Sequence, residues 1–157
     1  MLLAGLLALL LSGCADTQQQ PDAPAPNGKT MLISFESLQR PSSPNTWLIG
    51  PAAAPASLQV DSHAPEFGIP AAQLVDAWTQ IVKRQPRTRI VAVSDDGLQV
   101  EAEQRSALFR FVDKISFRAV ALDGDRSTFY AYSRSQVGYW DLGVNRKRLE
   151  RWVAELR

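Results

Sequence analysis

Residues 88–136 alternate between apolar and polar side chains, and two Asp-Gly pairs interrupt this alternation. An Asp-Gly pair between alternating segments is typical of the turn of a β-hairpin. Asp96-Gly97 therefore predicts one hairpin, and a second turn over residues 123–126 predicts another that ends in a strand over residues 128–136. These strands are expected to form an antiparallel four-stranded β-meander.

Side chains of a strand point alternately to its two faces, so the pattern also predicts which residues are buried. In the first hairpin the apolar residues share one face, which leaves the polar ones on the other. The predicted buried set is Val91, Val93, Val100 and Ala102, and the predicted exposed set is Gln99, Glu101 and Glu103. In the last strand Phe129, Ala131, Ser133 and Ser135 are assigned to the core, and Tyr130, Tyr132, Arg134 and Gln136 to the opposite face.

Two segments have the apolar spacing of amphipathic helices. Regular structure is expected to begin near Ile69, with Pro70 at a first helical position and a buried stripe of Leu74, Trp78, Ile81 and Val82. Asn145 is expected to cap a C-terminal helix with the stripe Leu149, Trp152, Val153 and Leu156. The predicted fold class is α+β, with helices packed on one face of the meander as a two-layer sandwich.

The first thirty residues carry a different signal. The apolar run Leu2–Leu11 is too short to span a bilayer and suits a signal peptide. It ends in Leu11-Ser-Gly-Cys14, which resembles the lipobox of bacterial lipoproteins, where cleavage precedes a cysteine that becomes lipidated. The predicted organisation is a signal peptide over residues 1–13, a flexible linker over 14–30 and a single globular domain over 31–157.

This resemblance also predicts a location. Several acyl chains on Cys14 would hold the chain at a membrane, facing the periplasm. By the lipoprotein sorting pattern, Ala15 after that cysteine favours the outer membrane over the inner one. Cys14 is the only cysteine, so an acylated Cys14 leaves no thiol for a disulfide or a nucleophile.

The charge balance argues against nucleic acid as a partner. The net charge is only +1, and the expected address is outside the cytoplasm. The positive charge is nevertheless uneven, because residues 105–157 carry eleven Lys or Arg against six Asp or Glu. The C-terminal third is therefore the basic part of the chain.

Several motifs together resemble a known family. The segments "EQRSALFRFVDKISF", "SRSQVGYWDLGVNRKR" and "RPSSPNTW" are similar to the bacterial and plastid family called domain of unknown function 1499. The likeness covers most of the chain after the linker. It implies no particular activity, cofactor or substrate, because the family has none established.

The chain departs from the family pattern at three places. Arg40 and Thr46 stand where the family often has cysteines, which excludes a disulfide or metal role there. A paired acid of the family is reduced to Asp113 followed by Lys114. Of two strand arginines in the family, one remains on that face, as Arg134.

The sequence offers little for catalysis or for a cofactor. His63 is the only histidine, and without a second histidine or a free thiol a transition-metal site would need carboxylates alone. No Ser lies in a G-x-S-x-G elbow and no glycine-rich phosphate loop precedes a helix. No catalytic residue, metal or cofactor is predicted.

The remaining polar constellation permits two interpretations. In the first, Arg105, Asp113 and Asp141 belong to structural ion pairs that tie strand ends to the last helix. In the second, the helix start binds a phosphate or carboxylate from a lipid, a wall polymer or a protein partner. The residues expected to bind it are Arg134, Asn145, Arg146 and Arg148.

Two classes of function follow from these observations. The sequence favours a non-enzymatic envelope lipoprotein that binds an anionic envelope component or a protein partner. The alternative is a hydrolase or transferase with a carboxylate-centred site. A pocket with a carboxylate of raised pKa would favour the alternative, and a shallow basic surface would favour binding.

Overall fold

The computed structural model describes residues 32–157, so the predicted signal peptide, Cys14 and the whole of the predicted linker lie outside the described residues. Within this part the chain forms one six-stranded sheet, two α-helices and a short 3-10 helix. The elements in order are β1 Thr46–Gly50, η1 Ala56–Leu58, β2 Ser62–His63, α1 Ala71–Arg84, β3 Thr88–Val93, β4 Gln99–Arg105, β5 Val112–Ala121, β6 Ser127–Ser135 and α2 Val144–Ala154.

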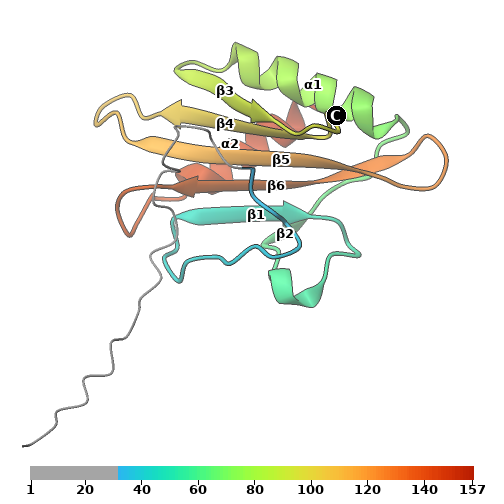
Figure 1. Cartoon of the computed structure of the whole chain (residues 1–157). Helices are drawn as coiled ribbons and strands as arrows, with labels where there is room; N and C mark the ends of the chain where they lie inside the picture. The colour runs from blue at the N-terminus through green and yellow to red at the C-terminus, as the bar shows by residue number, and fades with distance from the viewer. Residues whose placement is uncertain (1–31) are drawn as a thin grey trace, which may run out of the picture.

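The sheet contains the predicted meander but is larger than predicted. Its strand order is β2-β1-β6-β5-β4-β3, in which β3 to β6 are the four antiparallel strands read from the sequence (Figure 1). β1 adds to β6 in antiparallel fashion, and the short β2 pairs with β1 in parallel. Regular structure thus begins at Thr46 and not near Ile69, because Trp47, Leu48 and Ile49 continue the sheet beyond β6.

Both helices cover one face of the sheet, as predicted. Helix α1 begins after Pro70 and ends before Pro86, and its apolar stripe is buried. Trp78 stacks on Phe117 of β5 with ring centroids 4.4 Å apart, and Trp152 of α2 meets the edge of Trp78 at 5.5 Å. These aromatic contacts join the two helices and the sheet in one core.

The register of β3 differs from the prediction at one position. Val93 faces Val100 as expected, but Ile90 faces Ala102 in place of Val91, because the pairing shifts between Ile90 and Ala92. The bulge takes Val91 out of the core-facing set. Val93 still shares the face of Val100, but it lies at the end of the edge strand β3. Val93 is 55% exposed, so its assignment to the core is wrong.

The opposite face of the sheet is also covered, which the prediction of a two-layer sandwich missed. The N-terminal segment 32–45 crosses this face, in front of the sheet in Figure 1, while α2 lies behind. Its Phe35 packs with Leu48, Leu58 and Tyr132 in a second apolar cluster. The sheet is therefore enclosed on both sides over part of its area.

This second cover explains why two polar residues predicted to be exposed are buried. Gln99 donates a hydrogen bond to the backbone carbonyl of Ile33 at 2.7 Å, and Ile33 N–H donates to Glu101 Oε1 at 3.2 Å. Glu101 also accepts hydrogen bonds from Gln99 and Ser116. Burial raises the pKa of the Glu101 carboxyl, an effect that these hydrogen bonds and the charge of Arg134 oppose.

No helix among residues 32–157 is long and apolar enough to cross a bilayer.

Candidate functional site

Arg148 lies at the centre of a buried polar network between the sheet and α2. Its Nη2 pairs with the Asp113 carboxylate of β5, and both side chains are less than a tenth exposed. Its Nη1 donates to Ser133 Oγ at 2.9 Å and to Asn145 Oδ1 at 2.7 Å. Its Nε donates to Gln104 Oε1 at 2.7 Å. All three guanidinium nitrogens are therefore engaged within the fold.

Asn145 connects this ion pair to a second set of groups. It is fully buried, and its Oδ1 accepts from Ser133 Oγ at 2.6 Å. Its Nδ2 lies within hydrogen-bond distance of the Asn45 backbone carbonyl at 2.8 Å, of Ser135 Oγ at 3.0 Å and of Asp141 Oδ2 at 2.7 Å. Asn45 in turn donates to the backbone carbonyl of Gly138. The network thus ties the turn before β1 and the end of β6 to the first turn of α2.

Gly143 is the N-cap residue of helix α2, and Asp141, not Asn145, supplies the side chain that caps the helix. Its carboxylate accepts the backbone N–H of Gly143 at 2.9 Å and of Asn145 at 2.8 Å. Gly143 precedes the helix with a φ of +75°, a conformation that glycine adopts without a steric cost. The acidic cap satisfies N–H groups at the helix start and supplies negative charge there.

The three consecutive cations of α2 therefore have different surroundings. Arg148 is buried against Asp113, whereas Arg146 is exposed and pairs with Glu150 one turn later at 2.7 Å. The Arg146 guanidinium also lies 5.0 Å from the ring centroid of Trp47. Lys147 is exposed to solvent. The Asp141 cap and the Arg148 pair together offset the positive charge at this helix start.

The other two predicted site arginines lie apart from this network. Arg134 is on the opposite face of β6, where it is half-buried and lowers the pKa of Glu101 by its charge. Arg105 ends β4 with an exposed side chain, which forms none of the ion pairs found among residues 32–157. The structure therefore does not bring the seven predicted residues together as one site.

The buried network has no group free to bind an anion. The Arg148 donors and the Asn145 amide are directed at protein acceptors and covered by the fold. Buried charge of this kind holds elements in place when its partners are complete. The network fixes the loop between β6 and α2, with hydrogen bonds at Gly138, Asp141 and Gly143.

That loop and its neighbour carry most of the exposed large apolar side chains of residues 32–157. The loops, residues 106–111 and 136–143, leave adjacent strand ends at the left of the sheet in Figure 1, because Asp113 of β5 faces Ser135 of β6. Trp140 is 71% exposed and Leu142 is 85% exposed. The apolar loop surface, as it is named below, consists of Leu108, Phe109, Phe111, Val137, Tyr139, Trp140 and Leu142.

Sequence reasoning missed this surface, although its signal is present. Loops between strands usually carry polar, Gly, Pro, Asn or Asp residues. Here "ALFRF" and "VGYWDLG" place aromatic residues and leucines in the two connections. Soluble proteins rarely expose apolar groups in contiguous patches, and such patches mark interaction sites.

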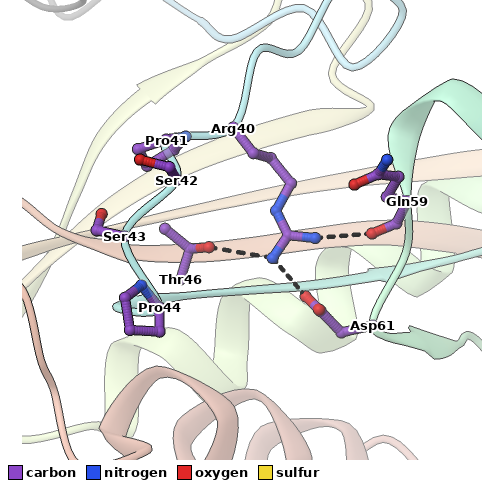
Figure 2. Close-up of a pocket in the computed structure, with 8 residues that line it drawn as sticks. All are labelled: Arg40, Pro41, Ser42, Ser43, Pro44, Thr46, Gln59 and Asp61. Atoms are coloured by element: carbon purple, nitrogen blue, oxygen red, sulfur yellow. Dashed lines mark hydrogen bonds and ion pairs between the residues drawn. The ribbon is translucent and has the colours of Figure 1, made fainter.

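A pocket of about 500 Å³ is lined by the Pro-rich turn before β1 together with Gln59 and Asp61 (Figure 2). Arg40 spans it, with Nη1 donating to the Gln59 carbonyl at 2.7 Å and Nη2 reaching Asp61 at 2.7 Å and Thr46 Oγ1 at 3.1 Å. The Asp61 carboxylate also accepts the Leu48 N–H at 2.7 Å. These contacts hold the turn against β1. Glu101, the carboxyl whose pKa is raised by burial, is not among the residues that line the pocket.

Arg40 and Thr46 stand at the two positions where the family that the motifs resemble often has cysteines. Their side chains are in hydrogen-bond contact, so the two positions are neighbours in space. Here a polar clamp ties the two ends of the turn together.

His63 is exposed in β2, and among residues 32–157 no group of His, Cys, Asp and Glu is arranged to hold a metal ion.

The motifs that meet at the buried network are the same ones that resemble a known family. Asn45 comes from one of these motifs and Ser133 and Asn145 from another, and Asn145 contacts the other two in the fold. No curated protein sequence matches the chain significantly. A family model described as "Protein of unknown function (DUF1499)" matches residues 22–156. The chain therefore belongs to the DUF1499 family.

Proposed function

We propose that this protein is an envelope lipoprotein, tethered to a membrane through Cys14, whose folded domain is a non-enzymatic binding module. The observation that carries the binding function is the gathering of exposed apolar side chains on two adjacent loops. The buried network supports it, because it holds one of these loops in a fixed conformation without filling a ligand site itself. In this proposal the apolar loop surface is the contact with the binding partner.

The tether is proposed from sequence alone. Leu11-Ser-Gly-Cys14 at the end of the apolar run suits lipoprotein processing, and the polar, Pro-rich composition of residues 14–30 suits a linker between the anchor and the domain. By the sorting pattern, the outer membrane is the favoured location. Growth with a clickable fatty acid should label the wild-type protein and leave the Cys14→Ser variant unlabelled, whereas labelling of both would contradict the tether.

Photo-crosslinking in living cells tests the binding surface. A photoreactive phenylalanine derivative in place of Trp140 should give crosslinked products. The matched control is the same substitution at Val93, which is also exposed and apolar but lies at the β3–β4 turn, at the opposite end of the sheet. A polar surface residue would be a poorer control, since it would change the local chemistry as well as the position.

The comparison has clear outcomes. Products at position 140 that are absent at position 93 support a binding function for the apolar loop surface, and their mass identifies lipid, polymer or protein. Equal products at both positions, or none at either, would contradict the proposed function.

A further inference from the structure

We infer that the apolar loop surface inserts into the interface of a lipid bilayer that contains anionic headgroups. The inference rests on the proposed function, because it names the partner that the same surface would contact. Its argument comes from the kinds of side chain in the loops, the charges around them and the way in which one loop is fixed.

The exposed side chains have the chemistry of a membrane interface. Trp and Tyr are favoured at the level of lipid headgroups, where the ring contacts the apolar region and the polar atom stays near water. Leu and Phe bury apolar area in the acyl region below. Leu142 and Trp140 are neighbours in one loop, and Leu108 and Phe109 form the tip of the other.

The loops stand among positive charges. Segments 105–114 and 134–148 together contain seven Lys or Arg and only two Asp. Both acids are already engaged, because Asp113 pairs with Arg148 and Asp141 caps α2. The exposed cations Arg105, Arg110 and Lys147 would therefore face an approaching anionic surface without a competing carboxylate from these segments.

The conformation of the longer loop is held in place. Leu142 has a φ of +54°, which is unfavourable for a leucine and persists only where the surroundings fix it. A hydrogen bond from the Gly143 N–H to the Asp141 carboxylate spans Leu142 and fixes its backbone. Leu142 is 85% exposed in this fixed conformation, so little ordering of the loop is needed on binding.

A bilayer fits this arrangement better than a protein groove does. Both loops extend from strand ends at the left of the sheet in Figure 1. The exposed apolar side chains are divided between these two loops, and exposed cations lie in the same segments of the chain. A planar anionic surface can receive both tips at once, and the proposed acyl tether keeps that surface within reach of the domain. A protein partner would need two matching cavities and acidic groups at the corresponding spacing.

Site-directed spin labelling tests the inference on the full lipoprotein reconstituted into vesicles. Cys14 is the only cysteine and its thiol is lipidated in the proposed form, so Leu142→Cys supplies one labelling site. Val93→Cys is the control, since it is exposed and lies at the opposite end of the sheet. The vesicles contain phosphatidylcholine alone or phosphatidylcholine with phosphatidylglycerol.

Collision rates with oxygen and with a water-soluble nickel chelate report the depth of each label. In phosphatidylglycerol vesicles the label at 142 should collide more with oxygen than with nickel, and the label at 93 should show the reverse. The Arg105→Gln and Lys147→Gln changes should each weaken insertion about fivefold, while Lys83→Gln on α1 should not change it.

An aqueous label at position 142 in both kinds of vesicle would overturn the inference. Equal insertion in both, unaffected by the charge changes, would overturn the requirement for anionic lipid. An aqueous label combined with a protein crosslinked at Trp140 would overturn the bilayer as partner and leave the proposed binding function standing. Absence of any crosslink would remove the proposed function itself.

Discussion

Replacing Arg148 with glutamine is expected to lower the free energy of unfolding by about 3–5 kcal/mol. The change leaves the Asp113 carboxylate buried without its cation, and it also removes the donors to Ser133, Asn145 and Gln104. The Asp113 carboxylate, buried without its cation, destabilises the folded state by more than the intact ion pair stabilises it. Chemical denaturation of both proteins at neutral pH measures the difference.

Two controls separate the buried pair from a general effect of lost charge. Arg146→Gln, two positions earlier, removes an exposed cation that pairs with Glu150 and should cost less than about 1 kcal/mol. The double change Asp113→Asn with Arg148→Gln leaves no unpaired charge, so its loss should be smaller than the sum of the single losses. Equal losses for Arg146→Gln and Arg148→Gln would contradict the structural role of the pair.

Replacing Trp152 with alanine should lower the free energy of unfolding by about 3–5 kcal/mol. Trp152 is fully buried and contacts Trp78, so the change opens a cavity where α2 meets α1 and the sheet. Trp140→Ala is the matched control, since it removes the same side chain from an exposed position and should change stability by less than about 0.5 kcal/mol.

Trp152→Phe adds a second comparison. The indole N–H of Trp152 is buried and has no hydrogen-bond partner among residues 32–157. Phenylalanine therefore removes an unpaired donor and keeps much of the apolar volume. We expect a loss below about 1.5 kcal/mol. If Trp152→Ala and Trp140→Ala melted at the same temperature, the packing of α2 described above would be wrong.

The local patterns in the sequence were sufficient for the two helices and the meander. Pro70 and Pro86 bracket α1, and the two Asp-Gly turns bring β3 to β6 together. Local patterns did not predict the bulge in β3, because a bulge depends on how two strands fit and not on either one. They also missed β1, whose short apolar run lies between prolines and gains its hydrogen bonds only from β6.

The candidate site shows the same division. The sequence placed Asp113, Asn145 and Arg148 in one polar constellation, and in the structure Arg148 contacts both of the other residues. It could not assign the helix cap to Asp141, because that choice depends on the path of the loop through Leu142. Glu101 was placed on an exposed face by strand alternation, and the covering segment at Ile33 comes from nearly seventy residues away.

The central claim is that the buried network holds the loop which presents Tyr139, Trp140 and Leu142. Hydrogen exchange at the loop amides measures this most directly. The N–H groups of Gly143 and Asn145, which donate to Asp141, should exchange slowly in the wild-type protein despite their exposed neighbours. In Asp141→Ala they should exchange roughly fivefold faster, as expected for a lost cap worth about 1 kcal/mol, with the β5 amides unchanged. Exchange of these two amides at the rate of an unstructured peptide in the wild-type protein would contradict the claim.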